Sequence, residues 1–368
     1  MKTQSNLEPT PQLKVCYALA YKAPKYIRTL SIIQALEREE KIHLTVATNS
    51  STNTFRYLET TLKLIIQAFR GRPDIYILGF RGHELYWLLK LIAGNRPIVI
   101  DALMSPYASL VEERKLGKAG LIISNIIKIV ESTILKSADL IITDTDSHSK
   151  YYSETFSISE KKIVTVPVGA IEIDHLTRTP VESSLTILFY GSFLPLHGVS
   201  TIVDAIAFIP DIPLHFIFIG GKLEYEKTLK KAFAKRTPTL SYKYIESVPF
   251  DQLIDFYIPM ADVCLGGPFG GTKQAHRVIT GKTSQCLALA RTTIIGETNE
   301  VKNFKHKENC LITKQNDPKS LAENITWCWD NRDRLEKIGI EGRKMYFTHL
   351  SIDVIRAKLT TALFNMNF

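Results

Sequence analysis

The sequence predicts an α/β protein with two doubly wound parallel-sheet domains that face each other across a cleft. Short apolar runs alternate with longer stretches of helical spacing along nearly the whole chain, as in βα units. This alternation restarts after a polar segment in the middle of the chain. At 368 residues the chain is also longer than one hydrophobic core usually supports, so two domains are expected.

The first half carries six strand candidates separated by helix candidates. Strands are expected at residues 14–19, 43–47, 75–78, 97–101, 140–143 and 163–167. Helices are expected at residues 26–40, 51–70, 84–93 and 121–137. Residues 1–175 are therefore expected to form a first Rossmann-like domain.

The second half repeats the alternation, with strands expected at residues 185–190, 215–219, 240–245, 263–266, 292–295 and 310–312. Residues 168–184 contain Pro180, several charges and no clear periodicity, which indicates a linker. A second Rossmann-like domain is expected at residues 176–350. A last helix within residues 351–368 is expected to pack back toward the first domain. Ligands of such sheets bind at the carboxyl ends of the strands, so the chemistry is expected in the loops after strands.

Composition narrows the class of protein. The chain is 45% hydrophobic and 23% charged, which is typical of a globular protein. The net charge of +9 favours an acidic partner, either a sugar phosphate or an anionic lipid headgroup. No basic run interleaved with aromatics and no zinc-finger signature is present, so nucleic acid is not expected. The five cysteines are odd in number and far apart, which indicates reduced thiols in the cytoplasm.

Two glycine loops follow strands in the second half. The first runs from Gly191 through Ser192 and His197 to Gly198, directly after the run ILFY, and it opens a helix. Gly191 allows close backbone approach, and a helix N-terminus favours an anion, so we expect a phosphate here. The alternative is an ordinary βα loop.

The second glycine loop spans residues 266–272 and includes Gly270 and Gly271. Successive amides in such a loop form an anion site, and the basic residue Arg277 follows it. A long turn is the alternative. A helix is expected after this loop, beginning at GKTS, residues 281–284. A Walker A motif is rejected because His276 stands where the motif needs glycine.

The order of these loops resembles family 4 of the glycosyltransferases, which are retaining enzymes of the GT-B fold. The matching stretches cover nearly the whole chain: ADLIITDTDSHSKYY, KKIVTVPVGA, ILFYGSFLPLHGVSTIVDAI, ADVCLGGPFGG and HRVITGKTSQCLALARTTIIGE. The resemblance implies that the second half binds a nucleotide-sugar donor and the first half an acceptor. It also implies retention of the donor's anomeric configuration, with the diphosphate assisting proton removal and no metal or other cofactor.

The sequence departs from that family at three donor positions. Ser192 and His197 stand where many members carry Arg and Lys against the diphosphate, and Gln285 stands where many carry a Glu that binds the ribose. We expect Lys282 and Arg277 to supply the missing positive charge, unless both are solvated surface cations. Because of these departures, a catalytically silent GT-B scaffold is an alternative function. A nucleotide-sugar epimerase shares the architecture, but nothing in the sequence favours it.

Candidate acceptor residues follow two strands of the first half. Arg81 and His83 come after the strand at 75–78, and Asp101 and Ser105 come at the end of the strand at 97–101. Asp101 is a candidate for orienting or deprotonating a sugar hydroxyl, with His83 and His148 as alternatives, while a capping role is the structural explanation. The Asp-Thr-Asp run at 144–146 is interpreted as a helix cap rather than a metal site.

The sequence thus predicts hexosyl transfer from a UDP- or GDP-sugar to a glycan or lipid-linked acceptor, in cell-surface polysaccharide synthesis. A cytoplasmic location is expected. The amphipathic run at residues 119–140 and the basic balance are compatible with peripheral docking at the inner face of the membrane. Core burial of that helix is the favoured interpretation, and membrane docking is the alternative.

Overall fold

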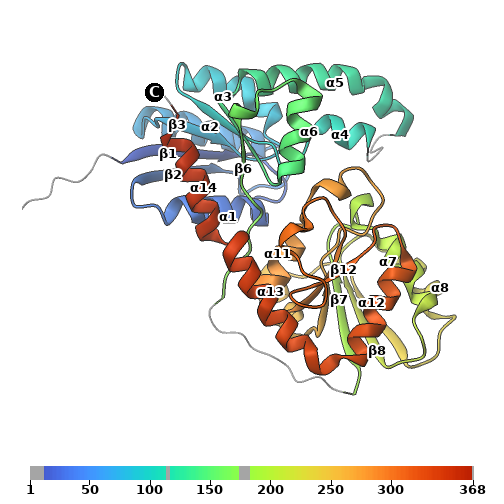
Figure 1. Cartoon of the computed structure of the whole chain (residues 1–368). Helices are drawn as coiled ribbons and strands as arrows, with labels where there is room; N and C mark the ends of the chain where they lie inside the picture. Colours follow the sequence, from blue (N-terminus) through green and yellow to red (C-terminus); the bar gives the residue numbers. More distant parts are fainter. Residues whose placement is uncertain (1–11, 113–116, 174–182, 367–368) are drawn as a thin grey trace, which may run out of the picture.

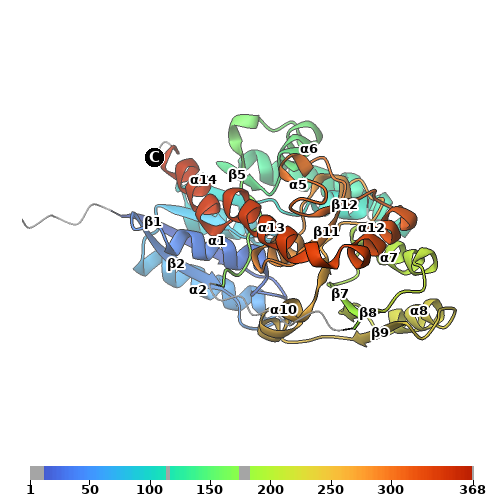
Figure 2. The ribbon, with the colours of Figure 1, turned by 60° about the horizontal axis from the view of Figure 1, so that its bottom comes forward.

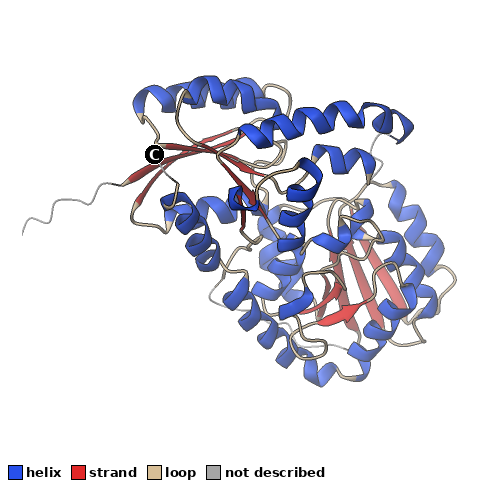
Figure 3. Ribbon diagram, turned by 45° about the horizontal axis from the view of Figure 1, so that its top comes forward, coloured by secondary structure: helices blue, strands red, loops and turns tan. Residues whose placement is uncertain are grey.

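The structure is a computed structural model, and it describes residues 12–112, 117–173 and 183–366. Two six-stranded sheets, each with parallel strand pairs, form the centres of two α/β domains (Figure 1). Helices cover both faces of the sheets (Figure 3). The expected fold class, two doubly wound parallel-sheet domains, is confirmed.

The first sheet has the strand order β2-β1-β3-β4-β5-β6. Its strands are β1 (Leu13–Leu19), β2 (Ile42–Thr48), β3 (Ile75–Leu78), β4 (Ile98–Asp101), β5 (Leu140–Thr143) and β6 (Ile163–Thr165). The helices of this part of the chain are α1 (Ile27–Glu37), α2 (Arg56–Arg70), α3 (Tyr86–Ala93), α4 (Pro106–Val111), α5 (Gly117–Ser137) and α6 (Asp146–Phe156). Helix α1 packs in one core cluster, and α2, α3, α5 and α6 pack in another on the opposite face of the sheet.

The second sheet has the strand order β12-β11-β10-β7-β8-β9. Its strands are β7 (Leu185–Tyr190), β8 (Leu214–Ile219), β9 (Leu240–Ile245), β10 (Val263–Leu265), β11 (Thr292–Gly296) and β12 (Leu311–Thr313). The helices that follow them are α7 (Val199–Ala205), α8 (Glu224–Phe233), α9 (Phe250–Gln252), α10 (Ile258–Met260), α11 (Gly281–Ala288), α12 (Pro318–Asp330) and α13 (Leu335–His349). Short 3-10 turns lie at His83–Leu85, Glu160–Lys162, Pro195–His197, Ile206–Phe208, Ala275–Arg277, Val301–Asn303 and Arg332–Arg334, and a π-helical turn at Leu253–Tyr257.

The last helix, α14 (Ile352–Phe364), returns to the first domain and lies beside α1 (Figures 1 and 2). Glu172 anchors this crossing. Its carboxylate accepts hydrogen bonds from the Tyr346 hydroxyl and from the backbone N–H of Ile352, at 3.1 and 2.9 Å. Arg38 of α1 forms an ion pair with the same carboxylate. The end of the chain is therefore fastened to both domains.

All twelve expected strands are present, with bounds that differ by at most two residues. The first expected helix ends earlier than predicted, at Glu37, and α2 begins at Arg56 rather than at residue 51. The start of α2 is shifted because the backbone N–H groups of Ser50 and Ser51 donate to the Glu59 carboxylate, which holds that segment in a turn. The expected domain division at residue 175 lies outside the described residues. Within the described ranges, no helix is long and apolar enough to cross a bilayer.

Candidate functional site

A cavity of about 1180 Å³ lies where the carboxyl ends of the two sheets face each other. Loops after β1, β2, β3, β4 and β5 form its first wall, and the loop after β7 with the start of α11 forms the second. This volume exceeds the roughly 1,000 Å³ at the upper end of ordinary ligand pockets. The cavity therefore has room for two ligands, one against each domain.

The loop after β7 brings the backbone close to two basic side chains. Gly191 has a φ of +145°, a conformation that glycine adopts readily. A Cβ atom there would lie 3.4 Å from Lys282 Nζ and 3.3 Å from the His197 ring. Gly191, Ser192, His197 and Lys282 all line the cavity. The structure thus brings together four of the expected donor residues.

Lys282 is a buried cation without a counter-ion. It is the second residue of α11, whose N-terminus is capped by the Thr280 hydroxyl. Its ammonium makes no hydrogen bond or ion pair with any described residue, and Nζ lies 5.9 Å from the centroid of the Phe189 ring. Burial lowers the pKa of Lys282 to about 7. An anion bound in the cavity would stabilise the charged ammonium and raise the pKa of Lys282 again.

His197 faces the same space as a neutral ring. Burial, and then the charge of Lys282, hold the pKa of His197 well below its usual value. Its Nδ1 accepts a hydrogen bond of 3.3 Å from the backbone N–H of Leu194. In the neutral ring the proton therefore resides on Nε2, which is left as a donor.

Gly270 and Gly271 do not line the cavity. A Cβ at Gly270 would come within 2.2 Å of the Pro195 carbonyl oxygen, and its N–H donates to the Leu196 carbonyl at 3.1 Å. Gly271 lies beside Asn316. In this structure, Gly270 serves close packing between the two glycine loops rather than direct contact with a ligand in the cavity.

Gln285 lines the cavity, but its amide is already engaged. Its Nε2 donates to the Ile171 carbonyl at 3.0 Å, and its Oε1 accepts from the Ile171 N–H at 2.9 Å. The side chain therefore ties α11 to the segment that leaves the first domain. This arrangement does not present the amide oxygen freely to a ribose.

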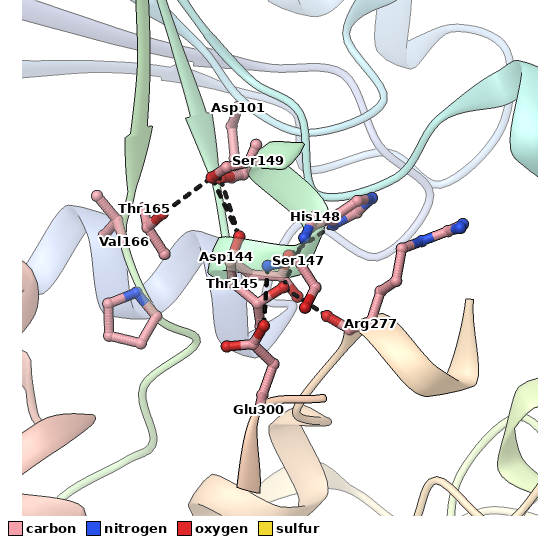
Figure 4. A network of polar contacts seen from close by, with 12 residues as sticks. Asp101, Asp144, Thr145, Ser147, His148, Ser149, Thr165, Val166, Arg277 and Glu300 are labelled. Carbon is pink, nitrogen blue, oxygen red and sulfur yellow. Dashed lines mark hydrogen bonds and ion pairs between the residues drawn. The ribbon is translucent and has the colours of Figure 1, made fainter. Parts of the chain in front are cut away.

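Arg277 joins the two domains and does not line the cavity. Its guanidinium pairs with Glu112 of the first domain and lies over the Tyr151 ring, 4.1 Å from the centroid. Its carbonyl accepts a hydrogen bond from the Thr145 hydroxyl, and nearby the Ser147 N–H donates to Glu300 (Figure 4). The charge of Arg277 is thus balanced at the domain interface, away from the donor loop.

Of the residues expected after β3, Arg81 lines the cavity and His83 does not. Both His83 ring nitrogens lack a hydrogen-bond partner in the described part of the chain, and Nε2 lies 4.0 Å from Glu131. Burial lowers the pKa of His83 to about 4, with a smaller contribution from Arg81. Ser105 caps α4 and donates to the same Glu131, so it also lies outside the cavity lining.

Asp101 is not placed to act on a sugar. Its side chain is fully buried and receives hydrogen bonds from the Arg28 guanidinium at 3.0–3.2 Å. Arg28 also donates to the carbonyls of Val166 and Pro167. The carboxylate expected to serve the acceptor is thus half of a buried ion pair, and it does not line the cavity.

Asp144, which the sequence suggested as a cap first and as a metal site second, lines the cavity. The cap of α6 is Thr145, whose hydroxyl accepts from the His148 N–H at 3.1 Å. Asp144 Oδ1 lies 2.6 Å from His148 Nδ1, which fixes the carboxylate. Asp144 directly follows β5 at its carboxyl end, and that position was the available signal in the sequence. Among the described residues, no group of three or more His, Cys, Asp or Glu is arranged to hold a metal ion.

Aromatic rings complete the first wall of the cavity. Tyr21 and Tyr26 both lie against Phe80, with ring centroids 4.8 and 5.0 Å apart, and all three line the cavity. Arg81 and Glu84 lie on the same wall. Rings beside charged and hydroxyl-binding groups suit a polar ligand with apolar ring faces.

Comparison with solved structures agrees with this architecture. The chain is similar to HepE of Anabaena in complex with UDP-glucose, with a TM-score of 0.70 and 12% identity over 95% of this chain and 99% of that one. It is similar to sucrose-phosphate synthase from Thermosynechococcus elongatus, with a TM-score of 0.72 and 13% identity over 97% of this chain and 100% of that one. A glycosyltransferase from Rickettsia africae gives a TM-score of 0.65 at 13% identity, over 96% and 99% of the two chains.

No protein-family model matches the sequence, and no curated protein is significantly similar to it. At 12–13% identity, the structural likeness establishes the fold. Two Rossmann-like domains that face each other across a cleft constitute the GT-B fold. The chain is therefore a GT-B protein with an unbalanced buried cation in the cleft between its domains.

Proposed function

We propose that the protein is a retaining glycosyltransferase that moves a hexosyl group from a UDP- or GDP-sugar to a glycan or lipid-linked acceptor in cell-surface polysaccharide synthesis. The observation that carries this proposal is Lys282, a buried ammonium without a counter-ion beside the Gly191 turn. A diphosphate is the anion that suits this position in a GT-B cleft. Four of the similar structures hold UDP or UDP-glucose, which supports a nucleoside diphosphate.

In this proposal the second domain stabilises the leaving group. Negative charge grows on the nucleoside diphosphate as its bond to the sugar breaks. Lys282 supplies positive charge at that place, and His197 Nε2–H supplies a hydrogen bond without an additional charge. We propose that the Ser192 hydroxyl assists from the same loop and that no metal or other cofactor takes part.

The first domain holds the acceptor. Tyr21 and Tyr26, which lie against the buried ring of Phe80, pack against the apolar faces of sugar rings, and Arg81 binds their hydroxyls. Asp144 takes the role that the sequence suggested for Asp101, because its carboxylate lines the cavity and is oriented by His148. It orients the attacking hydroxyl, while the departing diphosphate takes up the proton.

We place the reaction in the cytoplasm, at the inner face of a membrane when the acceptor is lipid-linked. All five cysteines are free and buried, which fits a reducing compartment.

Thermal unfolding in the presence of UDP, GDP, ADP and their common sugar conjugates tests the donor site. A ligand of the native state at a hundredfold excess over its Kd adds about 2.7 kcal/mol, so the Tm rises by several degrees. One nucleotide family is expected to give this rise, and Lys282→Met is expected to reduce it by half or more. Lys273→Met, at an exposed lysine on the neighbouring glycine loop, is the matched control. No rise with any nucleotide would refute the proposed donor site.

Asp144→Asn is expected to lower kcat roughly 10- to 100-fold through poorer positioning, with donor affinity unchanged. Glu84→Gln, which changes the other carboxylate of the cavity lining, is the comparison. An unchanged kcat in Asp144→Asn would remove the proposed role.

A catalytically silent scaffold is the second candidate, because Gln285 is engaged with Ile171 and Ser192 brings no charge. Such a protein binds the nucleotide but transfers no sugar. Incubating the donor with membrane and soluble glycan fractions separates the two functions by whether product forms. A nucleotide-sugar epimerase would convert the donor alone, and no observation favours it.

A further inference from the structure

Helix α2 turns its apolar stripe outward. Large apolar residues recur at the spacing of one helical face, namely Leu58, Leu62, Ile65, Ile66 and Phe69. A stripe of this kind normally packs on the protein core. Here these side chains are 36–79% exposed, while Thr60 and Leu64 on the opposite side are buried. Nothing in the described chain covers the stripe.

Helices α3 and α5 have the same arrangement. Trp87 and Leu91 of α3 are 52% and 80% exposed, and Ile122, Ile126 and Ile129 of α5 are 63–79% exposed. Core burial, the favoured interpretation of residues 119–140 from the sequence, is therefore wrong for this stripe. The side of α5 that packs inward instead carries Ser124, Glu131, Ile134 and Leu135.

These stripes belong to one surface. Residues from α2, α3 and α5 share one core cluster on the same face of the first sheet, and the three helices lie above that sheet in Figure 1. They carry 13 of the 21 exposed large hydrophobic side chains among the described residues. We call this surface the outer face. Such a concentration marks an interaction site rather than scattered surface residues.

The charges on these helices indicate the kind of partner. Glu59 is the one carboxylate on them that is not buried, and it pairs with Lys63. The other charged side chains that reach the surface are all cationic: Arg56, Arg70, Lys90, Lys118, Lys128 and Lys136. An apolar face with basic residues around it fits a bilayer with anionic headgroups. A second copy seated face to face would bring two sets of cations together.

The outer face is continuous with the first wall of the cavity. Arg56 and Tyr57, at the start of α2, line the cavity, and so do Arg81 and Glu84 just before α3. The apolar stripes thus begin next to the acceptor side. A molecule held in the bilayer by its lipid could present its head to this wall.

We propose that the outer face docks on the surface of an anionic lipid bilayer, with the apolar side chains of α2, α3 and α5 inserted among the lipids. Delivery of a lipid-linked acceptor into the cavity rests on the proposed glycosyl transfer. The docking itself rests only on the exposed stripes and the charges around them.

Co-sedimentation with vesicles tests the docking. The full chain is expected to sediment with phosphatidylcholine vesicles that contain phosphatidylglycerol, and much less with phosphatidylcholine alone or at high salt. The triple variant Phe69→Ser, Leu91→Ser, Ile122→Ser changes one strongly exposed side chain on each helix, so its fold is preserved. It is expected to bind at least about tenfold more weakly.

The matched control is Leu223→Ser, Phe256→Ser, Ile340→Ser, which removes exposed apolar residues of the second domain and is expected to bind as the wild type does. The proposal is overturned if the wild type does not bind anionic vesicles at low salt, or if the outer-face variant binds equally well. It is also overturned if light scattering shows a dimer that only the outer-face variant dissolves, because the occupant is then a second copy.

The membrane docking and the donor site are tested independently of each other. The outer-face variant is expected to keep its nucleotide-induced rise in Tm. Lys282→Met is expected to lose half or more of that rise and to sediment with vesicles as the wild type does.

Discussion

Two buried cations occupy matching places in the two domains. Arg28 is the second residue of α1, and Lys282 is the second residue of α11. The two helices begin close together, since a Cβ at Gly281 would lie 2.8 Å from the side chain of Ile27. Yet Arg28 is held by Asp101 and three backbone carbonyls, whereas Lys282 has no counter-ion among the described residues.

The difference separates a charge that stabilises the fold from a charge reserved for a ligand. A buried ion pair with all its hydrogen bonds made has little left to offer a substrate. A buried lysine without a partner is costly for the folded protein, and a bound anion removes that cost. We therefore assign Arg28 to the structure of the first domain and Lys282 to the donor site of the second.

The largest expected effect comes from breaking the balanced pair. Asp101→Ala leaves the Arg28 guanidinium buried without its carboxylate, which is expected to cost about 3–5 kcal/mol of unfolding free energy. Urea unfolding followed by circular dichroism measures it. The double variant Arg28→Met, Asp101→Leu is expected to recover most of the loss. If the Asp101→Ala protein were as stable as the wild type but impaired in glycosyl transfer, Asp101 would instead belong to the acceptor site.

Removing Lys282, the cation without a counter-ion, is expected to affect the unfolding free energy in the opposite way. Lys282→Met removes a buried charge, so the unfolding free energy should stay the same or rise. Donor affinity should fall about 10- to 100-fold, as expected for a lost charge-assisted contact of about 1.5–3 kcal/mol. Calorimetric titration with the donor measures this, with Lys273→Met as the control. Equal affinities in the two variants would contradict the comparison.

A smaller effect is expected at Gln285. Gln285→Ala breaks two hydrogen bonds with the Ile171 backbone and is expected to lower the unfolding free energy by about 1–2 kcal/mol. Donor affinity should change less than in Lys282→Met. A loss of donor affinity as large as that of Lys282→Met, with stability preserved, would show that Gln285 contacts the ribose directly.

The sequence was sufficient to predict the fold and the residues of one wall of the cavity. Alternation of apolar runs and helical spacing located all twelve strands, because parallel strands buried on both faces are continuous apolar segments. The loop with Gly191 and His197 and the start of α11 with Lys282 were found because each lies directly after a strand or at a helix start. Their proximity on one wall of the cavity follows from the order of strands in the second sheet, where β7 lies next to β10.

The acceptor side was less predictable because it depends on partners far away in the chain. Asp101 follows a strand as a catalytic residue would, but its partner Arg28 lies 73 residues earlier. Asp144 and Thr145 are both of a residue type that commonly caps helices, and only the structure shows that Thr145 is the N-cap of α6. The sequence also did not reveal that the apolar stripe of α2 is exposed, since the same periodicity is typical of a helix packed on a core.

The pH dependence of donor affinity tests the central claim, that Lys282 is the receptor for the donor diphosphate, most directly. The pKa of Lys282 is about 7 in the folded protein, below its usual value, so the unfolded chain holds the proton more tightly. Stability should therefore rise with pH above about 7, while donor binding, which needs the charged amine, should weaken. From about pH 7 to about pH 8, the Kd for a nucleotide sugar is expected to rise about fivefold in the wild type. In Lys282→Arg it should stay constant, because arginine remains charged. A wild-type Kd independent of pH over this range, with Lys282→Met binding equally well, would contradict the account.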